Sequence, residues 1–207
     1  MRQVGIDSGY RRHGDFTHAE HCHFRDTRSR DGDNPSAYHE CEEIMTGPSY
    51  TTAFSVDQSP QEAFEAITNP QGWWSAEIEG NAEKVGDEFR YHYEDLHRCT
   101  IRVTESVPGE KVAWHVVDNY FSFVKDSSEW VDTTMTFDIS EEDGKTKIIF
   151  THHGLVPEFE CYNACQEGWD NYINGSLKNL VAKGQGVPNA TGKAQTSAEM
   201  ELGSASR

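Results

Sequence analysis

The feature that most restricts the fold of this chain is a series of segments between residues 87 and 153 in which apolar and polar residues alternate. The clearest is "GDEFRYHYED", where Phe89, Tyr91 and Tyr93 share one face. The stretches "HRCTIRVTESV", "KVAWHVVD", "EWVDTTMTFDIS" and "TKIIFTHHG" repeat the pattern, with turn signals at Pro108-Gly109 and in "EEDGK". Alternation with a period of two is typical of strands that bury one face. We therefore predict a long antiparallel meander.

Helical patterns precede and follow this series. After a strand in "SYTTAFSV", Ser59, Pro60 and Glu62 fit the N-cap, first and third positions of a helix with a capping box. From Glu158 to about Lys183 there is no proline, and apolar side chains recur at three- and four-residue steps. One long helix packed on one curved antiparallel sheet makes a two-layer α+β fold. A cavity between these layers is the default ligand site.

Polarity divides the chain into three parts. Residues 1–49 and 184–207 are polar and show no apolar periodicity, so we predict a disordered N-terminal extension and a disordered C-terminal tail around one domain, residues 50–183. A cluster of histidines and cysteines in the extension is interpreted as part of that disordered segment rather than as a zinc site; it comprises His18, His21, Cys22, His23 and Cys41. Met45 is a candidate for the true start.

Charge and cysteine content limit the partners and the compartment. The formal net charge is −17, from 18 basic and 35 acidic residues, and such a protein repels nucleic acid and anionic membrane surfaces at long range. No apolar run approaches the length of a membrane span, and the N-terminus lacks a signal-peptide core. The five cysteines are an odd number, which favours a reduced, cytoplasmic protein.

The order of these elements resembles that of a known superfamily. The stretches "SPQEAFEAITNPQGWWS" and "TKIIFTHHGL" are similar to the START-like (SRPBCC) superfamily, and within it to the Aha-type domain, named for an activator of the heat-shock protein 90 ATPase. The resemblance covers roughly residues 50–183. It implies a helix-grip fold, in which the sheet wraps around the C-terminal helix and leaves an internal apolar cavity. It does not imply a particular ligand, because this fold serves many functions.

The candidate site residues are those expected to line that cavity. Aromatic rings supply large apolar area together with hydroxyl and indole N–H groups that orient a ligand. The candidates are Trp74, Phe89, Tyr91, Tyr93, Trp114, Met135, Phe150, His152, Cys165, Trp169 and Tyr172. Gly168 and Gly175 share a helix face, and we expect them to let the helix approach the sheet closely.

The junction "THHGLVPEFECYNACQEGW" raises the question of a metal site. Strand alternation predicts that His152 points toward the cavity and His153 toward solvent. Cys161 and Cys165 lie one helical turn apart, and with His152 they offer three ligands for zinc. The preferred interpretation is that both cysteines pack as small apolar groups. We therefore predict no metal and no cofactor.

Two further motifs carry alternatives. Asp95 and His97 are candidates for an acid–base pair at the cavity mouth, although an ordinary polar turn is the preferred interpretation. Trp73 and Trp74 are expected to anchor the first helix over the cavity, with an exposed partner site as the alternative.

Three functions are compatible with these observations. The first is the binding of an apolar or aromatic small molecule. The second is a co-chaperone-like module that stimulates a chaperone ATPase, with a role in the stress response. The third is an enzyme of the cyclase or hydrolase kind in which His152 serves as acid–base. The first is preferred, because no convergent catalytic pair can be placed.

Overall fold

The computed structural model describes residues 48–205. The predictions for the histidine- and cysteine-rich cluster, for Met45 and for nearly all of residues 1–49 lie outside the described residues. The elements in chain order are β1 (Tyr50–Val56), α1 (Pro60–Ile67), the 3-10 helix η1 (Pro70–Gly72), β2 (Glu79–Gly80), β3 (Glu88–Tyr93), β4 (His97–Val107), β5 (Lys111–Phe121), β6 (Thr134–Glu142), β7 (Lys145–His153), α2 (Tyr162–Trp169), the π-helix η2 (Asp170–Leu177), α3 (Lys178–Lys183) and α4 (Ser197–Ala205).

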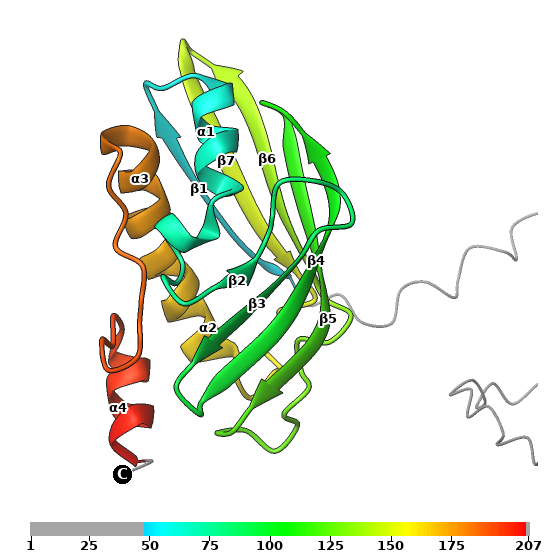
Figure 1. The fold of residues 1–207 in the computed structure, drawn as a ribbon, viewed down its shortest axis with the longest axis vertical. Helices are drawn as coiled ribbons and strands as arrows, with labels where there is room; N and C mark the ends of the chain where they lie inside the picture. The colour runs from blue at the N-terminus through cyan, green and yellow to red at the C-terminus, as the bar shows by residue number, and fades with distance from the viewer. Residues whose placement is uncertain (1–47, 206–207) are drawn as a thin grey trace, which may run out of the picture. The chain divides into compact units, whose positions relative to one another are not determined.

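The strands form one seven-stranded antiparallel sheet in the order β1-β7-β6-β5-β4-β3-β2. Alternation is strict in β3, where Phe89, Tyr91 and Tyr93 are buried and the residues between them are exposed. The pairing of β4 with β5 shifts register at Thr100/Ile101 and at Val103/Glu105. Such bulges bend strands, and the sheet curves around the helical layer (Figure 1).

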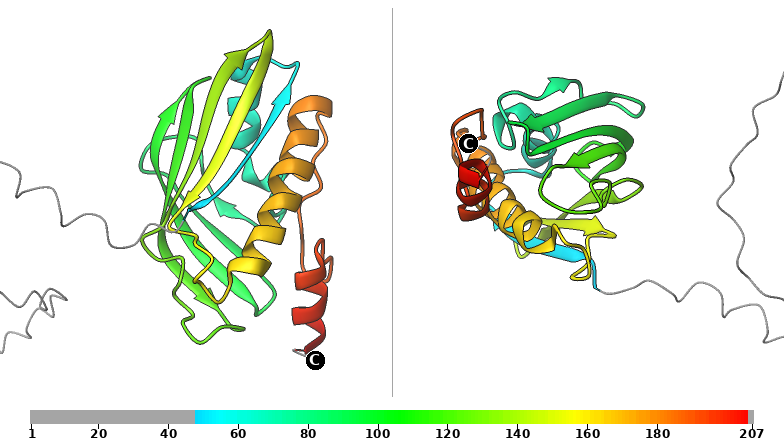
Figure 2. Two further views of the ribbon diagram at one scale, coloured as in Figure 1. Left: turned by 180° about the vertical axis from the view of Figure 1, so that it is seen from behind. Right: turned by 90° about the horizontal axis from the view of Figure 1, so that it is seen from below.

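The helical layer lies on the concave face of the sheet. Its main part runs from Tyr162 to Lys183 through α2, η2 and α3, and both views of Figure 2 show it beside the sheet. The predicted capping box of α1 is present, since the Ser59 N–H donates to Glu62 Oε2 (2.8 Å) and the Glu62 N–H donates to Ser59 Oγ (3.3 Å). The predicted α+β helix-grip fold is therefore confirmed.

The C-terminal segment, residues 184–205, departs from the prediction of a disordered tail. It continues from α3 and ends in α4, at the far end of the helical layer (Figure 1). Asn189 is fully buried: its N–H donates to the Trp74 carbonyl (2.9 Å), and its own carbonyl accepts from the Ala76 N–H (3.0 Å). Backbone and side-chain hydrogen bonds hold this segment in place, so apolar periodicity in the sequence does not predict its structure.

None of the helices between residues 48 and 205 is long and apolar enough to cross a membrane.

Candidate functional site

A cavity of about 80 Å³ lies between the sheet and the last helices. Its walls are mainly aromatic, and the rings come from the segment after η1, the sheet, the β5–β6 connection and the long helix. The aromatic side chains are Trp74, Tyr91, Tyr93, Phe121, Phe123, Trp130, Trp169 and Tyr172, with His97 among them.

Several of these rings form a continuous row. Trp74 stacks on Tyr91 with 4.6 Å between ring centroids, and the tilted ring of Trp169 lies 5.0 Å from that of Trp74. Trp130 stacks on Trp169 at 5.7 Å. Such a row presents large apolar area, and its ring faces carry negative electrostatic potential.

The structure brings only part of the predicted site set to the cavity. Trp74, Tyr91, Tyr93, Cys165, Trp169 and Tyr172 line it. The other predicted residues are buried in the packed core and do not line the cavity, contrary to the prediction; they are Phe89, Trp114, Met135, Phe150 and His152.

Part of the inner face of the sheet is filled by Trp73, the tryptophan that precedes Trp74. Trp73 is fully buried and stacks on Trp114 at 6.3 Å. Trp114 in turn meets Phe89 and Phe137 edge-on, each at 5.0 Å. Trp73 thus fills the space between α1 and the sheet, so that this half of the inner face is solid.

His152 is a core residue rather than a ligand contact. Its Nδ1 accepts from the Trp169 indole N–H (3.1 Å). Its Nε2 lies 2.9 Å from the Thr133 hydroxyl, which donates its own proton to the Trp130 carbonyl (2.6 Å), so Nε2 carries the hydrogen. Burial, followed by the proximity of His153 and His97, lowers the pKa of His152 to about 3. The side chain is therefore neutral and fully satisfied by the protein.

His97 is the histidine that faces the cavity. Its Nε2 donates to Asn119 Oδ1 (2.9 Å), because the Asn119 amide group itself donates to the Ser127 carbonyl (3.0 Å). The ring packs against Phe121 at 4.2 Å and Trp130 at 4.8 Å. Burial lowers the pKa of His97 to about 3, so the cavity contains a neutral imidazole with Nδ1 unprotonated.

The proposed acid–base pair does not form, because the partner of His97 is Asn119 and Asp95 is exposed. Trp73 and Trp74 are 0% and 2% exposed, which favours their anchoring role over an exposed partner site. The zinc alternative finds no support between residues 48 and 205, where no three metal-ligating side chains gather. Both nitrogens of His152 are already bonded.

The two helix glycines do not bring the helix close to the sheet, contrary to the prediction. A Cβ on Gly168 would have the Tyr172 ring as its nearest neighbour at 4.0 Å, and one on Gly175 would have Asn171 Oδ1 at 4.0 Å. Gly168 lines the cavity, so its missing side chain leaves space there.

The C-terminal segment forms one wall of the cavity, and this was not predicted from the sequence. Thr196, Ala198, Glu199 and Leu202 contribute to the wall. Further in, the Asn189 amide group donates to the hydroxyl groups of Tyr91 (3.1 Å) and Tyr172 (2.9 Å). The only signal available was the Thr196/Glu199 pair, which has capping-box spacing.

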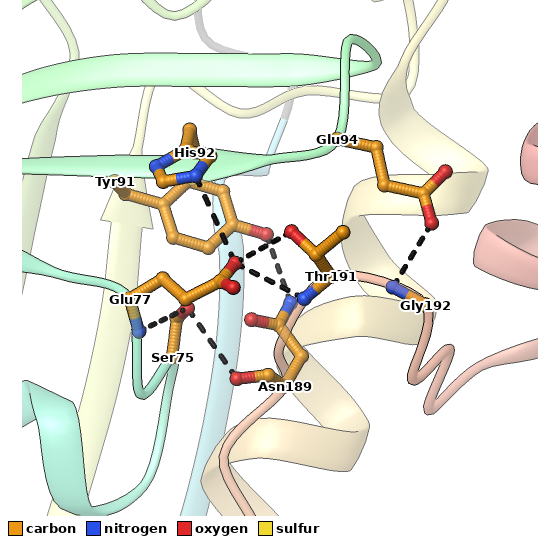
Figure 3. A network of polar contacts seen from close by, with 8 residues as sticks. All are labelled: Ser75, Glu77, Tyr91, His92, Glu94, Asn189, Thr191 and Gly192. Atoms are coloured by element: carbon orange, nitrogen blue, oxygen red, sulfur yellow. Dashed lines mark hydrogen bonds and ion pairs between the residues drawn. The ribbon is translucent and has the colours of Figure 1, made fainter.

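Carboxylates of the domain hold this segment by its backbone. Glu77 accepts from the N–H (3.0 Å) and hydroxyl (2.9 Å) of Thr191, and Glu94 accepts from the Gly192 N–H (3.2 Å) (Figure 3). The Glu167 carboxylate of α2 accepts from the first N–H groups of α4, at 2.9 and 3.1 Å. Negative charge is favourable at a helix N-terminus, so Glu167 fixes where α4 begins.

Comparison with known proteins agrees with this architecture. A family model described as Activator of Hsp90 ATPase homolog 1-like protein matches residues 57–182, more than half of the chain. No curated protein matches significantly. The solution structure of the Aha1 dimer from Colwellia psychrerythraea matches with a TM-score of 0.55 and 20% identity, over 68% of this chain and 100% of that chain. The crystal structure of protein MLL2253 from Mesorhizobium loti matches with a TM-score of 0.53 and 14% identity, over 65% of this chain and 96% of that chain.

At 20% and 14% identity the two solved structures show a shared fold. Membership of the family is shown by the match to the family model. The resemblance to an Aha-type START-like domain is thereby confirmed. The chain belongs to the Activator of Hsp90 ATPase homolog 1-like family.

Proposed function

We propose that the domain binds a small apolar or aromatic molecule in the cavity between the sheet and the last helices. The observation that carries this proposal is the row of rings from Tyr91 to Trp130, which borders a cavity instead of closing on itself. Ligand sites are typically concave and apolar, with few polar groups. Here the polar groups are the neutral His97 and the hydroxyls of Tyr91 and Tyr172.

The volume limits the ligand. About 80 Å³ is well below the roughly 300–1,000 Å³ of sites for drug-sized molecules. A ligand of a few non-hydrogen atoms fits within this volume, and a larger one extends through the open side of the cavity or displaces α4. We place the binding protein in the cytoplasm, with no role for nucleic acid, membrane, cofactor or metal.

Neither alternative function gains support from a particular feature of the site. A co-chaperone-like module needs an exposed recognition surface, and the tandem tryptophans that suggested one are buried. An enzyme needs a pair of groups converging on the substrate, but His152, the candidate acid–base, is bonded at both nitrogens and does not line the cavity.

A cavity-filling substitution tests the proposal. Gly168→Leu places a side chain in the cavity, and replacing a helical glycine favours the helix by up to about 1 kcal/mol. We expect it to abolish saturable binding of an apolar fluorescent dye without loss of stability. Gly175→Leu is the matched control, since Gly175 is on the same helix but does not line the cavity. Dye binding that survives Gly168→Leu, or is absent from the unmodified protein, would contradict the proposal.

A further inference from the structure

The cavity wall contains one negatively charged side chain among aromatic rings. Among the described residues that line the cavity, Glu199 on α4 is the one that carries a carboxylate. The rest of the wall is apolar or neutral, and His97 adds no positive charge because its pKa is lowered to about 3.

All hydrogen-bond partners of this carboxylate are neutral. Oε1 accepts from the hydroxyl of Tyr172 (2.5 Å) and the amide of Asn189 (3.4 Å), and Oε2 accepts from the N–H groups of Gln195 (2.5 Å) and Thr196 (3.3 Å). Within residues 48–205, the ion pairs involve other carboxylates and leave Glu199 without a cationic partner. The negative charge at the cavity is therefore oriented but not neutralised.

We propose that the cavity binds a small organic cation, an ammonium group carrying alkyl substituents, with its charge facing Glu199 and its methyl or methylene groups against the aromatic row. This inference rests on the proposed function and names the chemical class of its ligand. An ammonium ion over aromatic faces is attracted by the negative potential of the rings, most strongly when it is desolvated, and a nearby carboxylate adds to that attraction. A metal ion is a poorer fit, because hard cations require several oxygen ligands.

The rest of the molecule favours the same ligand. The net charge of −17 attracts cations toward the protein at long range. The Thr196/Glu199 capping box and the Glu167 carboxylate fix the start of α4, so the anionic group is preorganised. Glu199 lies outside residues 57–182, the part matched by the family model. The preference for a cation is thus a property of this chain beyond its family domain.

Choline and its uncharged isostere 3,3-dimethylbutan-1-ol separate charge from shape. Each is titrated into the full-length protein while tryptophan fluorescence is followed, because Trp74, Trp130 and Trp169 line the cavity. We expect saturable binding of choline and, for the alcohol, an affinity weaker by about tenfold or more. Glu199→Gln should reduce this difference because it removes the charge, and glutamine can still serve in the capping box. Glu201→Gln, an exposed change of equal charge on the same helix, should leave it intact.

The outcomes distinguish this inference from the proposed function. Equal binding of choline and the alcohol, or full choline binding by Glu199→Gln, overturns the inference. Apolar dye binding without choline binding also overturns it, while the cavity proposal stands. If neither dye nor choline binds, both proposals fail.

Discussion

Lowering the pH from 7 to 5 should destabilise the domain through His152. The unfolded chain binds a proton at this histidine below a pKa of about 6.5. The folded state does so only near a pKa of about 3. Because the unfolded state takes up the proton first, stability is lost as the pH falls through the window from about 6.5 to about 3. His97, whose pKa is also lowered to about 3, acts in the same direction.

The size of the expected loss of stability follows from how far the pH falls below the pKa of the unfolded chain. Each pH unit below the unfolded pKa costs about 1.4 kcal/mol per group, so 1.5 units between pH 6.5 and pH 5 cost about 2 kcal/mol from His152 alone. The ordinary pKa values of carboxyl groups, about 3.9 for Asp and about 4.3 for Glu, lie below the pH range of 7 to 5. The lowered pKa values of Glu62, Asp126 and Glu160, caused first by hydrogen bonds to Ser59, Ser128 and Lys125, come into effect only at lower pH.

Urea unfolding at pH 7, 6 and 5 measures the effect, with neighbouring histidines as a matched pair. His152→Gln should be less stable at pH 7 but lose about 2 kcal/mol less than the unmodified protein between pH 7 and 5. His153→Gln is the control, because His153 is exposed on the opposite face. Comparing slopes removes the general effect of net charge. An unchanged pH slope in His152→Gln, or an equal reduction in His153→Gln, would refute the reasoning.

Three further predictions concern packing and access. Trp169→Ala should lower the free energy of unfolding by about 3–5 kcal/mol in urea titration; a smaller loss would mean that the ring is mainly a cavity wall. A chain ending at Lys183 should lose about 1–3 kcal/mol, because the hydroxyls bonded by Asn189 lose their partner, and should bind apolar dyes more readily; unchanged stability would support a dispensable tail. The thiols of Cys99 and Cys161 should resist alkylation in the native protein, as judged by peptide mass spectrometry. Burial raises the pKa of Cys99, and a hydrogen bond of the Cys161 thiol to Cys165 together with burial raises that of Cys161; rapid modification would contradict this.

Residue alternation predicted most of the sheet, because it records which face of a strand is buried. The stretch "HRCTIRVTESV" coincides with β4, and Ser59 and Glu62 form the predicted capping box. The strand predicted for "EWVDTTMTFDIS" begins only at Thr134, where β6 starts. The preceding residues form turns around Asp132, which has a positive φ of 66°, a local conformation that apolar periodicity does not report.

Alternation could not predict which buried residues reach the cavity. His152 and Tyr91 both lie on the inner face, as predicted, yet only Tyr91 lines the cavity. The difference depends on how Trp73 and the Trp130 region pack against the sheet, which are contacts between residues far apart in the chain. His97 was a candidate at the cavity mouth, but its position in a polar turn sequence gave no sign that Phe121 and Trp130 enclose its ring.

The C-terminal segment combines two properties that bear on ligand entry. It forms one wall of the cavity, yet its contacts are mainly hydrogen bonds, to Glu77, Glu94 and Glu167 at the surface and from its Asn189 to the Tyr91 hydroxyl within. Hydrogen bonds contribute about 0.5–1.5 kcal/mol each, or up to about 3 with a charged partner. The long helix instead buries Trp169, Ile173 and Leu177 against the sheet, at about 1.5–3 kcal/mol for each apolar side chain. Elements held by few apolar contacts open locally before the core does. Release of residues 184–205, the same segment that supplies the Glu199 carboxylate, is therefore expected to widen access to the cavity.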